Sequence, residues 1–325
     1  MTSSNGAVRD ALTRREFLGA ATALAGVACA ARAPAGARTP ARDAADRGGS
    51  VELGFSTLGC PNWSWDEVLS FAAAHGFATL ELRGLLADMD LTRRPEFATD
   101  RLDSTRRQLA ERRLRVSCLG ASAGMHEMEP AKRAAAMAEA RRFVDLAAVL
   151  RAPYVRVFGD RYVAGVPRDE MLAHIARGLR ELGDHAHRRG VTVLVESHGD
   201  FTDSASLREL IERASSPAVA LLWDAHHTFV AGKEQPEQTV RELGRWIRHT
   251  HLKDSVPAGA DRRYVLTGTG EVPVQRQVQA LVASGYTGAF SFEWEKRWHP
   301  EIEEPEIAIA HYARVMREYV RDARR

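Results

Sequence analysis

The residues of this chain best suited to chemistry are carboxylates and imidazoles that recur just after short apolar runs. They are Glu196 with His198, Asp224 with His226 and His227, His249 with His251 and Lys253, and Glu293 with Glu295. Residues two apart share one face of a strand, so His249, His251 and Lys253 face one way and Asp254 faces the other. Two glutamates, an aspartate and a histidine make a mixed oxygen and nitrogen site that suits Mn²⁺, Co²⁺ or Zn²⁺, with Mg²⁺ as a further option.

Each of these residues also has a structural interpretation. A glutamate after an apolar strand is often the first solvated residue of a loop, and Asp224 can cap the following helix. One of His226 and His227 is expected to be structural, and His249 is expected to lie in the core or behind the site. Four consecutive runs that end in a carboxylate or an imidazole are harder to explain by packing than any single one. We therefore expect a functional site.

Eight β-rich runs alternate with helical segments whose apolar residues are spaced three and four apart. The predicted strands span 51–58, 78–82, 114–119, 154–158, 191–195, 218–223, 247–252 and 289–292. This alternation predicts a single-domain (β/α)8 TIM barrel over residues 51–325, with the polar strand ends gathered at one mouth. An open doubly wound sheet is the alternative. No Gly-x-Gly-x-x-Gly fingerprint follows the first strand, so no dinucleotide cofactor is expected.

The first 50 residues have the pattern of an export signal followed by a linker. Residues 13–18 read Thr-Arg-Arg-Glu-Phe-Leu, and an apolar run rich in Gly and Ala continues to residue 30. This pattern resembles a twin-arginine (Tat) signal peptide over 1–33, with 34–50 as a flexible linker. It predicts a periplasmic or extracellular protein with no stable membrane association after signal removal. The alternatives are a lipid anchor at Cys29 and a chance arginine pair.

Charge and cysteine content exclude some partners. Residues 1–50 carry seven arginines and four acidic residues, so their removal changes the formal charge from +2 to −1. A chain without a basic surplus is a poor candidate for binding nucleic acid. Cys60 and Cys118 lie near the ends of predicted strands that are not neighbours, so we expect buried free thiols and not a disulfide.

Motifs at several strand ends together resemble those of the xylose isomerase-like TIM barrels. The motifs are Asn62-Trp63-Ser64, residues 154–159, Val195-Glu196, residues 223–227, residues 249–254, residues 268–271 and Ser291-Phe292-Glu293. This group comprises the sugar phosphate isomerases/epimerases and the endonuclease IV relatives, in the AP endonuclease family 2 superfamily. The resemblance extends from residue 51 to about residue 319.

The resemblance implies a set of roles at the barrel mouth. The implied metal ligands are Glu196, Asp224, His251 and Glu293, and the two glutamates are also the implied catalytic base and acid. The implied substrate contacts are His198, His227, Lys253, Arg156 and Trp63, although Arg156 could equally belong to an ion-pair layer inside the barrel. The function implied is a metal-dependent isomerase or epimerase that transfers a proton through an enediolate on a free sugar or keto-sugar.

Other functions on the same barrel are a sugar or inosose dehydratase or lyase, and a non-catalytic exported sugar-binding protein. An endonuclease IV-like phosphodiesterase is disfavoured, because it needs a three-zinc cluster and Arg263 stands where a histidine ligand is wanted. The expected partner is a small carbohydrate and not a nucleic acid. A homo-oligomer is compatible with these features.

Overall fold

The computed structural model describes residues 52–86 and 88–325. The predicted signal peptide and linker lie outside these residues. The barrel strands are β1 Leu53–Ser56, β2 Thr79–Leu82, β3 Arg115–Gly124, β4 Tyr154–Phe158, β5 Thr192–Glu196, β6 Val219–Asp224, β7 Ile247–Leu252 and β10 Phe290–Phe292. The α-helices are α1 Trp65–Ala74, α2 Leu102–Glu111, α3 Pro130–Leu150, α4 Arg168–His187, α5 Ser204–Ala214, α6 Ala225–Val230, α7 Pro236–Leu243, α8 Val274–Ala283 and α9 Pro305–Ala323. Short 3-10 helices cover Thr57–Gly59, Leu91–Arg93 and Pro95–Phe97.

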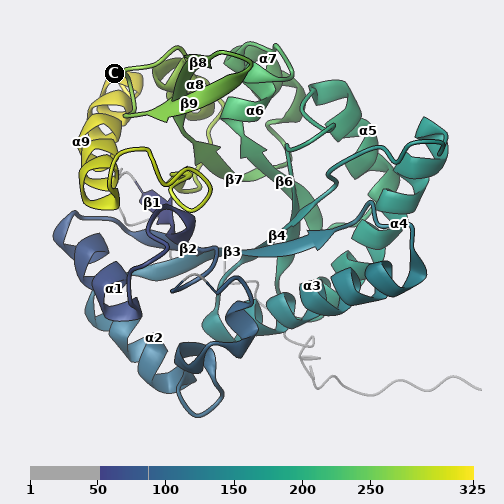
Figure 1. Ribbon diagram of the computed structural model, residues 1–325, viewed down its shortest axis with the longest axis horizontal. Helices are drawn as coiled ribbons and strands as arrows, with labels where there is room; N and C mark the ends of the chain where they lie inside the picture. Colours follow the sequence, from purple (N-terminus) through teal and green to yellow (C-terminus); the bar gives the residue numbers. More distant parts are fainter. Residues whose placement is uncertain (1–51, 87) are drawn as a thin grey trace, which may run out of the picture. The chain divides into compact units, whose positions relative to one another are not determined.

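Eight parallel strands close into one barrel in the order β1-β10-β7-β6-β5-β4-β3-β2. Figure 1 shows the helices arranged around these strands. The fold is therefore the single (β/α)8 TIM barrel predicted from the alternation of strands and helices. The strand register places His251 of β7 between Asp224 of β6 and Ser291 of β10, which brings the polar strand ends to one level.

Local sequence explains how individual helices begin. Helix α1 starts with a capping box, in which the Ser64 hydroxyl accepts the Glu67 backbone N–H and the Glu67 carboxylate accepts the Ser64 N–H. These bonds satisfy amide groups that have no partner inside the helix. Helices α3, α7 and α9 each begin with a proline, which is tolerated in the first turn because its missing N–H has no role there.

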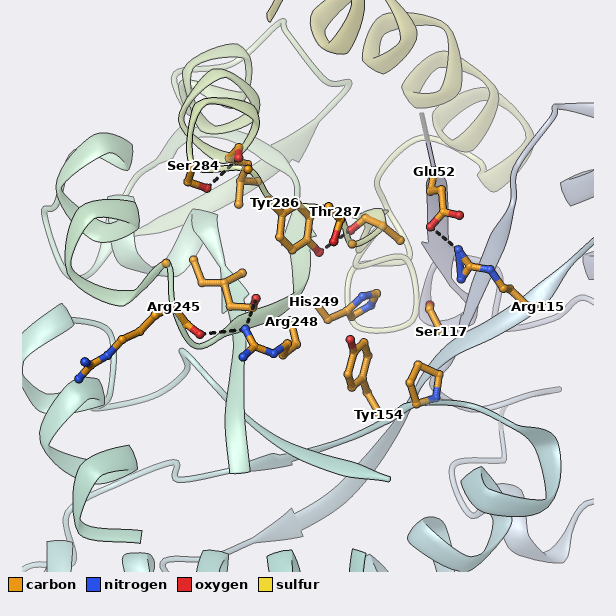
Figure 2. Close-up of a pocket in the computed structure, with 17 residues that line it drawn as sticks. Glu52, Arg115, Ser117, Tyr154, Arg245, Arg248, His249, Ser284, Tyr286 and Thr287 are labelled. Carbon is orange, nitrogen blue, oxygen red and sulfur yellow. Dashed lines mark hydrogen bonds and ion pairs between the residues drawn. The ribbon is translucent and has the colours of Figure 1, made fainter. Parts of the chain in front are cut away.

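The interior of the barrel changes from apolar to polar along the strands. A small buried cluster fills the part of the interior nearer the amino-terminal ends of the strands. It consists of Cys118, Leu194, Ala220 and Leu222, and Tyr154 packs against this cluster. Two residues further along β5 and β6 come Glu196 and Asp224, on the same inner face. A pocket opens at the amino-terminal mouth beside Tyr154 (Figure 2). Glu196 and Asp224 lie at the opposite, carboxyl-terminal mouth.

A two-stranded antiparallel hairpin, β8 Asp254–Ala258 and β9 Asp261–Val265, is inserted between β7 and α8. Its base is fixed by Asp254, whose carboxylate accepts backbone N–H groups of Ser255, Gly268, Gly270 and Val272 at 2.8–3.1 Å. A Cβ on Gly270 would lie 2.2 Å from an Asp254 oxygen, so only glycine fits there. Asp254 thus anchors the loop. The hairpin itself was not predicted from the sequence.

The two cysteines of the barrel, Cys60 and Cys118, are buried and free, which confirms the prediction of buried thiols. Burial raises the pKa of both, so neither is a reactive thiolate. Within residues 52–86 and 88–325, no helix has both the length and the apolar character that a membrane span requires.

Candidate metal centre and active site

Four side chains from neighbouring strands converge at the carboxyl-terminal mouth. Glu196 ends β5, Asp224 ends β6, His251 lies on β7 and Glu293 directly follows β10. One ligand atom from each lies within 4.8 Å of the others, and all four residues are buried. The structure thus brings together the four residues that the sequence resemblance implied as metal ligands. We call this set the quartet.

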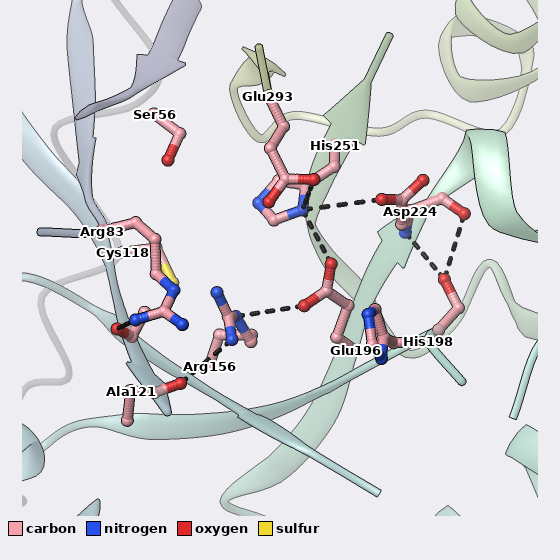
Figure 3. Close-up of polar contacts among 12 residues, drawn as sticks. Ser56, Arg83, Cys118, Ala121, Arg156, Glu196, His198, Asp224, His251 and Glu293 are labelled. Carbon is pink, nitrogen blue, oxygen red and sulfur yellow. Dashed lines mark hydrogen bonds and ion pairs between the residues drawn. The ribbon is translucent and has the colours of Figure 1, made fainter. Parts of the chain in front are cut away.

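The imidazole of His251 lies at the centre of the quartet (Figure 3). Its Nδ1 is 2.9 Å from Glu196 Oε1, 3.2 Å from Glu293 Oε2 and 3.9 Å from Asp224 Oδ2. Burial alone would lower the pKa of His251, but Glu293, Glu81 and Glu196 raise it well above its usual value. The carboxylates therefore attract positive charge to the position of Nδ1.

Two observations indicate that the quartet could hold a divalent ion. Its donors are three carboxylates and one imidazole nitrogen, a set that suits Mn²⁺, Co²⁺ or Zn²⁺. Glu196 Oε2 is paired with Arg156 Nε at 3.1 Å, so the other oxygen, Oε1, is the one directed at His251 Nδ1, at 2.9 Å. That oxygen lies where a cation held by the quartet would be bound.

Glu81, at the end of β2, is a member of the site that the sequence analysis did not assign. Its Oε2 accepts from His249 Nε2 at 2.9 Å and from His251 Nε2 at 2.7 Å. Burial alone would raise the pKa of Glu81, but the two imidazoles lower it far below its usual value. A carboxylate that binds Nε2–H of His251 leaves Nδ1 directed at the quartet, which is the usual way to orient a metal-binding imidazole.

Lys253 was predicted to contact substrate, but the structure places it among carboxylates. Its Nζ donates to Asp224 Oδ2 and to Glu295 Oε1, both at 2.7 Å, and it forms an ion pair with Glu293. The side chain is fully buried. Burial alone would lower the pKa of Lys253, but Asp224, Glu293 and Glu295 raise it well above its usual value. Lys253 is therefore a fixed positive charge beside the quartet.

Glu295 is a second residue that the sequence analysis did not assign a role. It is bonded to Lys253, and burial is the largest influence on its pKa. That burial and the charge of Glu293 raise the pKa of Glu295 above its usual value, against the opposing effect of Lys253. By contrast, His251 and Lys253 lower the pKa of Glu293 well below its usual value, although burial opposes them.

Arg156 crosses the interior from β4 and holds Glu196. Its Nε lies 3.1 Å from Glu196 Oε2, and its Nη1 donates to the Ala121 carbonyl at 3.0 Å. Burial alone would raise the pKa of Glu196, but Arg156 and His251 lower it to about 2. Of the two roles considered for Arg156, the structure shows the contacts of a buried ion pair.

His198 and His227 lie at the rim, where they remain partly open to solvent. The His198 side chain is 38% exposed and its Nδ1 is 3.2 Å from Asp160 Oδ1. The His227 side chain is 20% exposed and its Nδ1 is 3.0 Å from the Ser197 carbonyl. His226, in contrast, is buried and its Nε2 is 2.8 Å from Ser255 Oγ, so His226 is the structural member of the pair.

Trp63 lies apart from these contacts. Its ring packs on Phe71 of α1, with centroids 4.7 Å apart, and its Nε1 donates to Glu306 of α9 at 3.2 Å. It lines a pocket of about 440 Å³ with residues that include Lys296 and Arg297. The structure does not bring Trp63 to the quartet.

The hairpin adds a residue that the sequence did not reveal. The Tyr264 ring lies 5.4 Å from that of His226 and 5.1 Å from that of His299, and Lys253 Nζ is 5.9 Å from its centroid. Further ring contacts join His226 to His227 at 5.6 Å and His227 to His198 at 5.1 Å. Of these rings, those of His198, His227 and Tyr264 are partly exposed, so they can pack against the C–H groups of a ligand beside the quartet.

Several solved structures share this fold at low sequence identity. The IOLI protein, solved with a bound zinc atom, is 17% identical, with a TM-score of 0.69 over 84% of this chain and 99% of that chain. An L-ribulose 3-epimerase is 18% identical, with a TM-score of 0.68 over 85% of this chain and 96% of that one. A probable 3-DHS dehydratase, AsbF from Bacillus anthracis, is 17% identical, with a TM-score of 0.66 over 82% and 98% of the two chains.

At these identities the likeness shows a common fold. No curated protein sequence matches the chain. The model of one protein family, the xylose isomerase-like TIM barrels, matches residues 69–319, which is most of the chain. The chain therefore belongs to the xylose isomerase-like TIM barrel family.

Proposed function

We propose that the protein is a divalent-metal-dependent enzyme that isomerises or epimerises a free sugar or keto-sugar by proton transfer. The observation that carries this proposal is the convergence of Glu196, Asp224, His251 and Glu293 from four neighbouring strands. The proposed ion is Mn²⁺, Co²⁺ or Zn²⁺, and the zinc atom of the IOLI structure supports this choice. The epimerases among the similar folds support a carbohydrate substrate.

A divalent ion held by the quartet would polarise a substrate carbonyl and the hydroxyl on the adjacent carbon, which acidifies the hydrogen on that hydroxyl-bearing carbon. Glu196 is our candidate for the group that removes that proton, because Arg156 fixes Oε2 and leaves Oε1 directed at the quartet. Glu293 reaches the same space from β10, with β6 and β7 lying between it and β5. Two carboxylates on different sides of one carbon can invert its configuration, because one removes the proton and the other returns it on the opposite face. If the proton is instead moved between adjacent carbons on one face, the product is the aldose or ketose isomer of the substrate.

Dehydration is the second candidate, and the pair of Glu295 with Lys253 is the observation that favours it. Nζ of Lys253 donates to Glu295 Oε1 at 2.7 Å, and burial and Glu293 raise the pKa of Glu295, so a proton shared by these two groups lies beside the quartet. A proton donor there can transfer its proton to a leaving hydroxyl, which departs as water after a base removes the proton from the adjacent carbon. The similarity to a probable dehydratase supports this reaction class.

Solvent deuterium exchange tests the first function. The Mn²⁺-loaded protein is incubated in D₂O with a panel of sugars, keto-sugars and inososes, and exchange at the carbon next to the carbonyl is followed by NMR. We expect exchange with at least one substrate and its loss in Glu293→Gln. The matched control is Glu303→Gln, an exposed glutamate on the same loop, which should behave like the wild type.

The outcomes separate the candidates. Release of water with formation of an unsaturated product identifies a dehydratase. Less than about half an equivalent of bound metal after Mn²⁺ loading, together with an unchanged melting temperature, would favour a non-catalytic sugar-binding barrel. Retained exchange in Glu293→Gln would remove Glu293 from the proton-transfer step.

We also propose that the mature protein works outside the cytoplasm. The support is the Thr-Arg-Arg-Glu-Phe-Leu motif and the apolar run after it. Replacing Arg14 and Arg15 with lysine should retain the protein in the cytoplasm, as judged by cell fractionation. Export of the double variant would contradict a twin-arginine signal.

A further inference from the structure

A second pocket, of about 400 Å³, opens at the amino-terminal mouth of the barrel. It is lined by residues at or just before the starts of strands, among them Glu52, Arg115, Tyr154 and Arg248, and by residues 284–289. Because the barrel strands are parallel, this mouth is opposite to the quartet. Its volume is within the range of pockets that bind small molecules. Figure 2 shows Tyr154, His249 and Tyr286 around its centre, with Arg248 beside them.

The pocket carries one positive charge that no carboxylate neutralises. Arg115 forms an ion pair with Glu52. Arg248 is exposed, and its Nη1 donates only to the main-chain carbonyls of Arg245 at 2.9 Å and Ile247 at 3.1 Å. Among residues 52–86 and 88–325, no carboxylate forms an ion pair with Arg248. A guanidinium whose remaining N–H groups have no acceptor in the protein is a common partner of a carboxylate ligand.

The hydroxyl groups of the lining are arranged to accept hydrogen bonds. Ser117, Ser284 and Tyr286 donate their hydroxyl protons to main-chain carbonyls of the protein at 2.8–3.1 Å. The oxygens of Ser117 and Ser284 are therefore left for donors on a ligand, whereas the Tyr286 oxygen also interacts with the Thr250 side chain. The hydroxyl of Tyr154 forms no hydrogen bond with any residue that the structure describes. These groups suit a ligand that carries several hydroxyls.

His249 provides the independent observation that points to a ligand. It is 1% exposed and lines the pocket, and its Nε2 is bonded to Glu81. Its other ring nitrogen, Nδ1, is buried and has no hydrogen-bond partner in the described part of the chain. A buried ring nitrogen without a partner is uncommon in folded proteins, because it loses water without replacing it.

We propose that this pocket binds a hydroxylated carboxylate of about six carbons, the class of the sugar acids. The carboxylate pairs with Arg248, and hydroxyls bond to His249 Nδ1 and to the tyrosine and serine oxygens. None of the four quartet residues lines this pocket, although Glu81 bonds both His249 of the pocket and His251 of the quartet.

Calorimetric titration of the full-length protein with D-gluconate tests the proposal. We expect saturable binding, with D-sorbitol, which lacks the charge, at least about tenfold weaker. Arg248→Ala should lower the affinity for gluconate about tenfold or more, because a charge-assisted pair is lost. The matched control is Arg263→Ala, an exposed arginine on the hairpin, which should leave the affinity unchanged.

Gluconate can also bind a metal ion, so a second comparison locates it. Binding that is retained in Glu196→Gln and weakened in Arg248→Ala supports the pocket, whereas the opposite pattern overturns the proposal. Absence of saturable binding to the wild type also overturns it. If Arg248→Ala does not fold, Tyr154→Phe decides: affinity lower by about threefold supports the proposal, and unchanged affinity overturns it.

Discussion

The two glutamates of the quartet, Glu196 and Glu293, come from different sides of the barrel mouth and are held by different cations. On the side of β4 and β5, Glu196 is paired with Arg156, and that guanidinium is itself fixed by the Ala121 carbonyl. On the side of β7 and β10, Glu293 shares Lys253 with Asp224 and Glu295. One side has one arginine for one carboxylate, and the other has three carboxylates around one ammonium. His251 contacts both glutamates.

This difference separates two tasks. Arginine does not release its proton in proteins, so the charge that holds Glu196 is permanent. Lys253 binds oxygens of Asp224 and Glu293, which are also proposed metal ligands, so Lys253 and a divalent ion compete for the same groups. The side of Glu196 therefore keeps its charge whether or not metal is bound. The side of Glu293 is expected to change with the metal.

The largest expected effect is that of Arg156→Met. It leaves Glu196 buried without its cation, which should lower the free energy of unfolding by about 3–5 kcal/mol in metal-free protein. Urea unfolding measures this. Saturating Mn²⁺ should restore only part of the loss, because the ion can offset the charge of Glu196 but cannot replace the bond of Arg156 to the Ala121 carbonyl. The control is Arg276→Met, which breaks an exposed pair with Glu237 and should cost less than about 1 kcal/mol.

Lys253→Met tests the other side and should have a somewhat smaller effect. Without metal, three carboxylates lose their shared cation, and we expect a loss of about 3 kcal/mol in the free energy of unfolding. Saturating Mn²⁺ should recover most of this loss, because the ion binds the same carboxylates. Equal recovery by Arg156→Met and Lys253→Met would show that the two sides do not differ in the way proposed.

Glu81→Gln tests whether the orientation of the His251 ring affects metal affinity, because it leaves the charges of the four quartet residues unchanged. The amide keeps the shape of Glu81 but cannot accept equally well from His249 and His251, so Nδ1 of His251 is held less firmly. We expect Mn²⁺ affinity to fall about 10- to 100-fold, as for other partners of metal-binding histidines. Calorimetry measures this, with the exposed Glu111→Gln as control. Unchanged affinity would mean that packing alone orients the imidazole.

The convergence of the quartet could be predicted from the sequence because the topology of the barrel determines which strand ends are neighbours. Glu196, Asp224 and His251 end or lie on consecutive strands, and consecutive parallel strands are neighbours in a barrel, so their polar ends must meet. The strand bounds were close as well, and β4 and β7 were predicted with the bounds observed. The main differences in length are β3, which continues to Gly124, past the predicted end at residue 119, and β1, which ends at Ser56, before the predicted end at residue 58.

The parts that were missed depend on contacts that no local pattern encodes. Glu81 meets His251 across the barrel, 170 residues away in sequence, and its only local signal is its position at a strand end. The β8–β9 hairpin contains Pro257 and Gly259 and lacks a regular apolar alternation, so its pairing is not visible in the sequence. The partners of Lys253 could not be predicted either, because strand geometry gives the face of a residue but not the groups that its long side chain reaches.

The smallest expected effect concerns Tyr264, which the hairpin holds beside the Glu293 side of the quartet. Its ring contacts His226 and His299 and stands near Lys253, so we expect it to pack against the substrate and not to transfer protons. Loss of the ring in Tyr264→Ala should raise KM about three- to tenfold with little change in kcat, as expected for one aromatic contact. Tyr264→Phe keeps the ring and is the control. If the alanine variant lowers kcat and leaves KM unchanged, Tyr264 instead acts by keeping Lys253 and Glu293 in place.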